Sequence, residues 1–397
     1  MNLFMRNEYL KTIKQRYVKA SKAERGLILD EYCRNTNQNR KYVIRKLSPK
    51  MSLVKKQRKA RQKVYHNQTI AELIKIWEVL DYPCGQRLKP VLGQMVEKLK
   101  ALGEINPSNE TITQLLKISS ATIDRRLGHE KEYLHRKRFT TTKPGSLLKA
   151  QIPIRLTDWN LSLIGFVEVD LVAHCGDNVF GDYVNTLDLT DIASGWSEQA
   201  AVWGKGQRNV FIALLSLRKR MPFTWLGLDS DNGSEFINIH LFNYCQKENI
   251  EFTRARPNRK NDNAYIEQKN WTHVRKLVGY QRLETIKQLK SLNDLYADEL
   301  RLYKNFFCPT MKLISKERIG SKIIKKRESA KTPYQRLMES SQITLAVKVR
   351  LKATYDRLNP VKLKQIIDLK LSQIKSNNFN LKCNPKNEML LVTKYVI

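Results

Sequence analysis

The sequence predicts a mixed α/β core between two basic, mainly helical regions. Strand-like and helix-like patterns alternate between residues 158 and 285, which is typical of a mixed five-stranded sheet packed with helices. Residues 161–285 contain 14 Lys and Arg against 15 Asp and Glu, although the whole chain has a net charge of +34. A near-neutral core with strongly basic flanks indicates a catalytic unit that its flanks hold on a polyanion such as a nucleic acid.

Changes in composition divide the rest of the chain. Each of two α-helical segments is followed by a basic stretch that we interpret as a linker. The expected divisions are helix-turn-helix-like DNA-binding modules over 1–49 and 67–130, linkers over 50–66 and 131–157, the core over 158–285, and a basic C-terminal region for DNA binding or multimerisation over 286–397.

The first module is expected to have three helices. An apolar period covers residues 5–19, and Ser21 begins a capping box for a second helix in which Leu27 faces inward. A short basic helix follows the polar sequence RNTNQN. If the third helix lies against DNA, its contacts are Arg40, Lys41 and Arg45. A plain three-helix bundle with a solvated basic face is the alternative.

The second module contains a stronger helix-turn-helix candidate. Thr69 is expected to cap its first helix, and a second helix ends at Gly103. The sequence TITQLLKISSATIDRRL then predicts a short helix, a turn capped by Ser119 and a further helix. The DNA-contacting residues of that last helix would be Thr122, Arg125 and Arg126. A purely structural role for this segment remains the alternative.

The core sequence predicts its elements in a definite order. Three strands that suit an antiparallel meander come first, over 165–174, 182–191 and 196–203. A helix over 209–220, a strand over 223–230, a helix over 239–250 and a strand over 251–256 follow. A last helix over 264–278 closes the unit. Downstream, we expect helices over 286–305, 340–356 and 360–375.

Three acidic residues occupy positions that suit phosphoryl-transfer chemistry. Asp170 lies in the first strand, Asp231 lies where a later strand meets an Asn-Gly turn, and Glu267 lies early in the last helix. Reactions at phosphodiesters use two hard cations about 3.5–4 Å apart. Because Mg²⁺ and Mn²⁺ favour carboxylate oxygens, three carboxylates could hold such a pair.

Two further carboxylates compete for these roles. Glu168 shares a strand face with Asp170, and Asp229 shares one with Asp231, because side chains alternate along a strand. Asp229 is expected to have a supporting role, and Glu235 is expected to lie on the surface. A structural ion pair is the alternative interpretation of Asp170.

The pieces EVDLVAHCG, SDNGSEF and NAYIEQKN, in that order, resemble the catalytic core of DDE transposases and retroviral-type integrases. Sixty residues separate the first two acids, and 35 separate the second from the third. The closest likeness is to bacterial insertion-sequence transposases, which also often contain segments such as TKPGSLLK and IPIR. The resemblance covers about residues 140–340, and it implies a ribonuclease H-like fold.

The resemblance also implies an activity. It predicts cleavage at the ends of a DNA element and attack of the 3′-hydroxyl on target DNA, with Asp170, Asp231 and Glu267 as both catalytic residues and ligands of two Mg²⁺ or Mn²⁺ ions. The partners would be double-stranded DNA and further copies of the chain on paired ends. A DNA-binding regulator without catalysis and a nuclease without strand transfer are the alternatives.

Basic side chains near the three acids are candidates for contacts with the DNA backbone. Arg259 and Lys260 belong to a loop rich in Asn and Pro, of a kind that is often mobile over an active site until substrate binds. Lys269 and Lys276 share one stripe of the last helix. A solvated basic face explains the same stripe equally well.

Two further features concern the cellular compartment. The six cysteines show no C-x-x-C spacing, so we expect free thiols in a reducing compartment. The first residues lack the apolar run of a signal peptide, and no stretch is apolar for as long as a membrane span requires. We therefore expect a cytoplasmic, nucleoid-associated bacterial protein.

Overall fold

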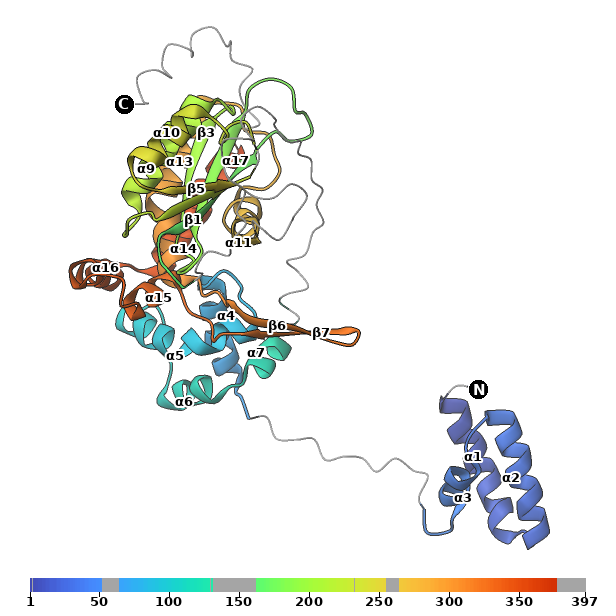
Figure 1. The fold of residues 1–397 in the computed structure, drawn as a ribbon. Coiled ribbons are helices and arrows are strands. Elements are labelled where there is room, and N and C mark those ends of the chain that lie inside the picture. Colours follow the sequence, from blue (N-terminus) through green and yellow to red (C-terminus); the bar gives the residue numbers. More distant parts are fainter. Residues whose placement is uncertain are drawn as a thin grey trace. The chain divides into compact units, whose positions relative to one another are not determined.

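The computed structural model describes residues 1, 3–51, 64–128, 130, 162–231, 233–254 and 264–376. The chain forms two compact units, Met1–Val64 and Tyr65–Ile397 (Figure 1). Arg259 and Lys260 lie outside the described residues, as do most of the two expected linkers. Among the helices of the described ranges, none is both long and apolar enough to cross a membrane.

The first unit is a three-helix bundle of α1 (Leu3–Lys19), α2 (Lys22–Thr36) and α3 (Arg40–Leu47). The expected capping box is present, because the backbone N–H of Ser21 donates to Glu24 Oε2 over 2.8 Å. The expectation for Leu27 was wrong. Leu27 is 70% exposed, and Leu29 packs in the core with Leu10 and Tyr32 instead.

The second unit begins with α4 (Asn67–Val79), α5 (Gly85–Ala101), α6 (Asn109–Lys117) and α7 (Ser120–Arg126). Helix α4 starts two residues before Thr69, so Thr69 is not its cap. The buried Thr69 hydroxyl donates to Gln114 Oε1 over 2.6 Å and thereby joins α4 to α6. Ser119 does cap α7, since its hydroxyl accepts from the backbone N–H of Thr122.

The core contains a five-stranded sheet in the order β3-β2-β1-β4-β5. Strands β1 (Phe166–Ala173), β2 (Val184–Asp191) and β3 (Ser197–Trp203) form an antiparallel meander, as expected. Strands β4 (Gly227–Ser230) and β5 (Glu251–Arg254) run parallel to β1. Crossover helices α9 (Gln207–Arg220) and α10 (Ile239–Lys247) make that parallel pairing possible. This is the expected ribonuclease H-like arrangement.

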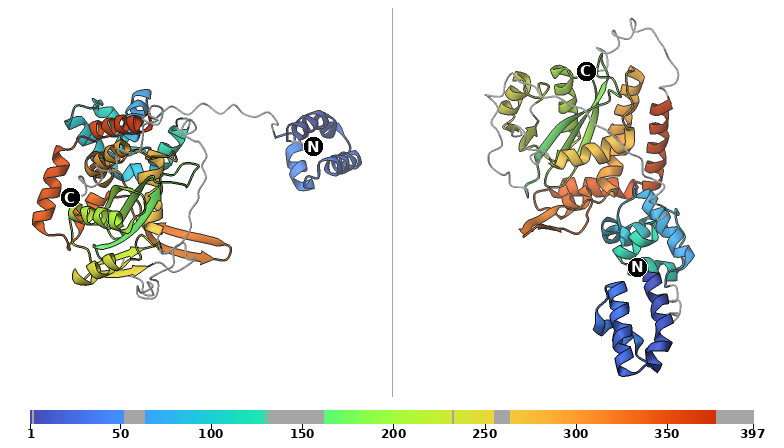
Figure 2. Two further views of the ribbon diagram at one scale, coloured as in Figure 1. Left: turned by 90° about the horizontal axis from the view of Figure 1, so that it is seen from above. Right: turned by 90° about the vertical axis from the view of Figure 1, so that its right-hand side faces the viewer.

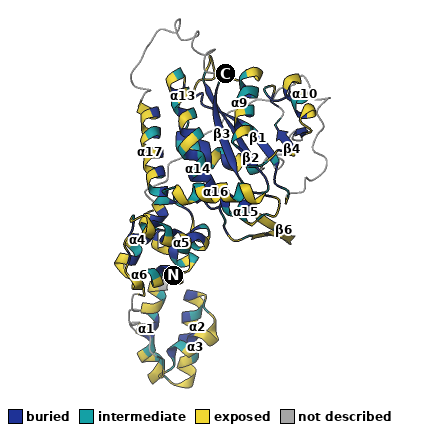
Figure 3. Ribbon diagram, turned by 90° about the vertical axis from the view of Figure 1, so that its left-hand side faces the viewer, coloured by how far each residue is buried: buried dark blue, intermediate teal, exposed yellow. Residues whose placement is uncertain are grey.

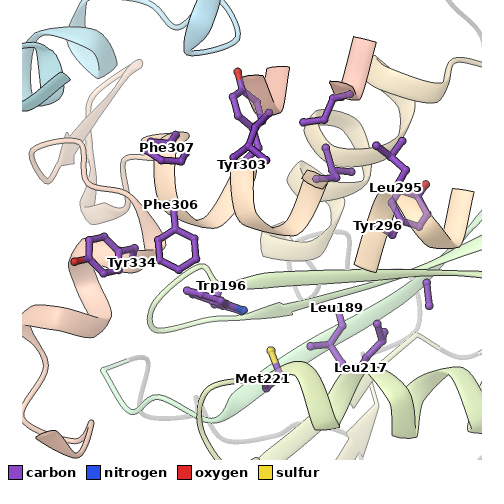
Figure 4. Packing of buried hydrophobic residues seen from close by; sticks show 14 of the residues in the cluster. Leu189, Trp196, Leu217, Met221, Leu295, Tyr296, Tyr303, Phe306, Phe307 and Tyr334 are labelled. Atoms are coloured by element: carbon purple, nitrogen blue, oxygen red, sulfur yellow. The ribbon is translucent and has the colours of Figure 1, made fainter. Parts of the chain in front are cut away.

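Helices cover both faces of this sheet, which explains why β2 and β4 are buried along their whole length (Figure 3). Leu217 of α9 and the nearby Met221 pack on one face (Figure 4). On the other face, Trp196 makes an edge contact with Phe306 at 5.6 Å between ring centroids. Burial on both faces removes the polar and apolar alternation that a half-exposed sheet would show.

The helix expected over 264–278 changes its hydrogen-bonding spacing in the middle. It consists of α11 (Ala264–Lys269), a π-helical segment η1 (Asn270–Arg275) and α12 (Lys276–Val278). A π-helical segment widens the turn and rotates the residues that follow it relative to an ordinary α-helix. Such segments are frequent at functional sites, and this one begins three residues after Glu267.

The C-terminal region contains helices in the three expected ranges, and also a short helix and a hairpin that were not expected. The helical elements are α13 (Ile286–Leu295), η2 (Tyr296–Leu300), α14 (Arg301–Phe307), α15 (Pro333–Glu339), α16 (Leu345–Arg357) and α17 (Pro360–Ser376). Between α14 and α15, strands β6 (Leu313–Ile319) and β7 (Lys322–Arg327) form a hairpin. Its turn contains Gly320, whose φ of +60° favours glycine.

The second helical module packs directly on the core. Asp81, between α4 and α5, forms ion pairs with Lys276 and Lys304, each at 2.8 Å. The Tyr303 hydroxyl donates to the carbonyl oxygen of Val79 over 2.6 Å. Burial alone would raise the pKa of Asp81, but Lys304 and Lys276 outweigh it and lower that pKa. The module therefore belongs to the same compact unit as the sheet.

Candidate active site

The parallel pairing of β1 with β4 brings two of the expected acids together. Val169 pairs with Ser230 as the last couple in this register. Asp170 and Asp231 are the next residues after this last pair on the two segments, so they lie side by side just beyond the β1–β4 pairing. Neighbouring strands lie about 4.8 Å apart. The register therefore places Asp231, just past the end of β4, beside Asp170 in the middle of β1.

Electrostatics confirms that these two carboxyl groups are close. Burial and then the nearby Asp231 raise the pKa of Asp170 to about 7. Two hydrogen bonds act in the opposite direction. The backbone N–H of Leu171 donates to Asp170 Oδ1 over 2.7 Å, and Asn270 Nδ2 donates to Asp170 Oδ2 over 2.6 Å. The carboxyl group is thus held in one orientation by both of its oxygens.

The turn after β4 positions Asp231 and also brings in a residue that was expected on the surface. The backbone N–H of Gly233 donates to Asp231 Oδ1 over 2.9 Å. A β-carbon at Gly233 would lie 2.7 Å from Glu235 Cδ and 2.9 Å from Asp231 Oδ1, so a larger residue here would push both carboxyl groups aside. Burial raises the pKa of Asp231, and the Glu235 carboxylate raises it further. Glu235 is therefore part of the acidic cluster, contrary to expectation.

The two rival carboxylates are buried and hold neighbouring elements in place. Glu168 Oε2 accepts from the backbone N–H of Ile266 over 3.0 Å, at the first turn of α11. Asp229 Oδ1 accepts from the Thr253 hydroxyl over 2.5 Å, which joins β4 to β5. Both side chains are fully buried. These contacts give each acid a structural role beneath the exposed end of the sheet.

Glu267 lies on the helix that flanks this acidic cluster. Ile266 and Asn270, on either side of it in the sequence, contact Glu168 and Asp170. Residues three apart share a helix face, so Glu267 is on the same side as Asn270. Its side chain is exposed. The structure thus brings Asp170 and Asp231 together and places Glu267 on the adjacent helix, outside their immediate cluster.

Within the described ranges, no group of three or more His, Cys, Asp or Glu side chains is arranged to hold a metal ion. The Asp170 and Asp231 pair nevertheless suits a hard divalent cation. Two neighbouring carboxyl groups whose pKa values are raised by burial carry a repulsion that such a cation relieves. Mg²⁺ is commonly bound by one or two carboxylates together with water and substrate phosphate.

The two lysines of the basic stripe expected on the helix after Glu267 differ in exposure. Lys269 is only 7% exposed, and its ammonium donates to the carbonyl oxygen of Gly195 over 2.9 Å. The expectation that Lys269 contacts DNA was therefore wrong, because this side chain is buried. Lys276 is exposed and paired with Asp81, so its contact with DNA stays a prediction.

A buried polar network surrounds Lys269. Burial lowers the pKa of Lys269 to about 7, against the effect of nearby Asp188. Burial raises the pKa of Asp188 to about 7, and Gln199 Nε2 donates to its Oδ1 over 2.8 Å. Asp188 pairs with Asp170 across β1 and β2. Helical spacing predicts that Asn270 shares a face with Glu267, but no pattern in the sequence distinguishes Asp188 as a neighbour of the site.

The remaining basic candidates are exposed on two helices. Arg40, Lys41 and Arg45 lie on the outside of α3, where Arg40 pairs with Asp30 and Arg45 lies over the Tyr42 ring. On α7, Arg125 and Arg126 are exposed and Thr122 is half-buried. Contact of these six residues with DNA therefore stays a prediction.

Lys205 also lies near the acidic cluster, although no pattern in the sequence distinguished it. This exposed lysine lowers the pKa of Asp231.

Comparison with known proteins identifies one curated relative and several solved structures. The chain is 36% identical over 337 residues to the uncharacterized protein y4rM of Sinorhizobium fredii, covering 85% of this chain and 96% of the relative. No family model matches the chain.

The similar solved structures include integrases. The catalytic core domain of BIV integrase has a TM-score of 0.28 and 21% identity, covering 43% of this chain and 91% of that chain. The HTLV-2 integrase catalytic core domain in complex with magnesium has a TM-score of 0.28 and 14% identity, with coverages of 37% and 91%. A simian T-cell lymphotropic virus intasome with a PP2A regulatory subunit has a TM-score of 0.31 and 13% identity, with coverages of 60% and 72%.

Proposed function

This chain belongs to the same family as protein y4rM of Sinorhizobium fredii, and we propose that it is a DNA transposase of an insertion sequence. In this proposal it cleaves the strands at the ends of the element and joins them to target DNA. One observation carries the proposal. The parallel register of β1 and β4 sets Asp170 beside Asp231 at the end of β4 in a ribonuclease H-like sheet, next to the helix of Glu267.

The chemistry proposed for this site is displacement at a phosphodiester. A new bond forms between the phosphorus and the oxygen of water or of a DNA 3′-hydroxyl, and the bond to the leaving oxygen breaks. Asp170, Asp231 and Glu267 would hold one or two Mg²⁺ or Mn²⁺ ions. When bound, such ions stabilise charge on the attacking and leaving oxygens. No side-chain nucleophile is needed for this reaction.

The residues around the acids have distinct roles in the proposal. Asn270 fixes the orientation of the Asp170 carboxylate, while Gly233 allows Asp231 and Glu235 to approach the backbone. Glu168 fixes the start of the helix on which Glu267 lies. Lys205 supplies positive charge at the rim of the cluster, where it would meet a DNA phosphate.

Cleavage of DNA that contains the element ends tests the assignment of the acids. Asp170→Asn, Asp231→Asn and Glu267→Gln should each abolish Mg²⁺-dependent strand cleavage and leave binding to the same DNA nearly unchanged. Gln268→Ala, at an exposed position of the same helix, is a matched control and should cleave normally. Cleavage by any acid variant at the wild-type rate would remove that residue from the proposed site.

Two further measurements separate the proposal from its alternatives. Cleavage without joining of the 3′-end to a second duplex would make the protein a nuclease rather than a transposase. Specific binding without any cleavage in Mg²⁺ or Mn²⁺ would make it a DNA-binding regulator. Cleavage that continues in excess chelator would exclude the role proposed for the divalent cations.

A further inference from the structure

The β6–β7 hairpin extends away from the body of the second unit (Figures 1 and 2). Every residue of β7 is exposed. The exposed residues include isoleucines on both strands, with Ile319 61% exposed and Ile324 53% exposed. A two-stranded hairpin without a covering layer is only marginally stable in water. Its exposure therefore indicates a surface that is completed by a partner.

The charges of the hairpin identify the class of partner. Its two strands contain six Lys and Arg residues and a single acidic residue, Glu317. Arg318 pairs with Ile323 in the register, so these two residues share a face with Lys325 and Arg327 by alternation along β7. Glu317 pairs with Ile324 and lies on the opposite face. One face thus presents three cations beside an isoleucine.

The base of the hairpin is fixed to the core by a buried arginine. Arg336 is 9% exposed and forms an ion pair with Glu328, the residue that follows β7. The same guanidinium donates to the carbonyl oxygen of Thr310 over 2.8 Å and to that of Ser194 over 3.3 Å. The hairpin is therefore joined to the β2–β3 turn and projects from a rigid base.

The same turn also contacts the helix of Glu267. Gly195 has a φ of +73°, and its carbonyl oxygen accepts from Lys269 at the end of α11. A β-carbon at Gly195 would lie 3.9 Å from Arg336 Nη1 and 4.0 Å from Lys269 Nζ. Gly195 is thus the junction between the hairpin base and the helix beside the acidic cluster. A duplex held by the hairpin would keep a fixed position relative to that cluster.

We propose that the β6–β7 hairpin is an arm that binds the phosphate backbone of duplex DNA without reading its sequence. A two-stranded ribbon fits a DNA groove, and Lys and Arg side chains neutralise phosphates. Neutralisation of phosphates does not depend on the neighbouring bases, so such an arm suits DNA of any sequence, such as the target. This inference rests on the proposed function, because target DNA is the duplex that a transposase would have to hold.

Duplex binding by the full-length chain tests the arm. The probe is a random-sequence duplex without element ends, and the variant carries Arg318→Gln, Lys325→Gln and Arg327→Gln. All three residues are exposed, so the fold should be retained. A matched control carries Lys348→Gln, Arg350→Gln and Arg357→Gln on α16, with the same change of charge. We expect the arm variant to bind roughly ten-fold or more weakly and the control to bind like the wild type.

The salt dependence of binding provides a sharper measurement. Each lost phosphate contact lowers the slope of log K against log salt by about 0.9, so the arm variant should lose about 3. An unchanged slope, an equal loss in the α16 control, or no duplex binding by the wild type would overturn the proposal. Loss of self-association with unchanged DNA binding would assign the hairpin to a contact between copies instead.

The arm and the proposed catalytic function fail in different assays. Asp170→Asn should bind the random duplex normally while it fails to cleave end DNA. The arm variant should retain cleavage of intact end DNA at saturating concentration but lose joining to the random duplex. An arm variant with normal binding and joining would refute the arm alone, whereas an active Asp170→Asn protein would refute the catalytic assignment alone.

Discussion

Asn270 Nδ2 donates to Asp170 Oδ2 over 2.6 Å and so connects two segments that are 100 residues apart in the chain. Asn270 is the first residue of the π-helical segment, three residues after Glu267. This bond favours the charged form of Asp170 and opposes the effects of burial and of Asp231 on its pKa. It therefore links the orientation of the helix to the protonation state of the acid.

Replacement of Asn270 by alanine should reduce cleavage in a pH-dependent way. Without the donor, the pKa of Asp170 rises above about 7, so a smaller fraction is ionised at neutral pH. A hydrogen bond to a charged group contributes about 1.5–3 kcal/mol, which corresponds to a loss of roughly ten-fold or more. Rates measured from pH 6 to 9 should show the acidic limb moving to higher pH, with partial recovery at pH 9. An unshifted profile would contradict this role.

Replacement of Gly233 by alanine should damage the site more than the fold. The new β-carbon would approach Glu235 Oε2 at 2.8 Å and Asp231 Oδ1 at 2.9 Å. Both atoms are at the ends of side chains that can move, so the loss of stability should be small while both carboxylates shift. We expect cleavage to fall at least ten-fold and the melting temperature to change by only a few degrees. Gly128→Ala, where no atom lies within 4 Å, is the control.

Replacement of Glu235 by glutamine should stabilise the metal-free protein. The Glu235 carboxylate raises the pKa of Asp170 and of Asp231, so its removal lessens repulsion between like charges. In excess chelator at pH 8, the melting temperature should rise, and the further rise on addition of Mg²⁺ should be smaller than in the wild type. Glu317→Gln on the exposed hairpin should change neither value. Equal responses of Glu235→Gln and wild type would place Glu235 outside the cluster.

Replacement of Asp81 by asparagine should loosen the helical module from the core. Lys304 is 3% exposed and would keep a buried charge without its acidic partner, a loss that typically costs about 3–5 kcal/mol. Hydrogen exchange should increase along α4 and at α14 more than in the rest of the sheet. Asp368→Asn removes the exposed pair with Lys364 and should cost about 1 kcal/mol or less.

The pH dependence of this loss has a definite sign. The pKa of Asp81 is lowered in the folded protein. Its contribution to stability is therefore present above its pKa in the unfolded chain, which is about 3.9. This contribution disappears as the pH falls through the lowered pKa of Asp81 in the folded protein. The difference in unfolding free energy between Asp81→Asn and wild type should therefore be constant near neutrality and shrink in acid. A difference that grows in acid would rule out the ion pairs as its source.

The sequence by itself determined the elements of the core and the places of its acids. Strand and helix periods located β1–β5 and the helix of Glu267, and the capping signals at Ser21 and Ser119 marked two helix starts. These features depend on residues that are close together in the sequence, so a local sequence pattern predicts them. The Asn-Gly turn likewise marked the end of β4, where Asp231 stands.

Only the tertiary structure decided which of these residues meet. The β1–β4 register set Asp170 beside Asp231, the packing of the core and the C-terminal region buried Lys269, and Asp81 of the second module paired with Lys276. The hairpin was not expected either, because its basic strands lack the apolar alternation of a buried sheet. Burial, pairing and pKa depend on atoms that lie far away in the chain, so a local sequence pattern cannot contain them.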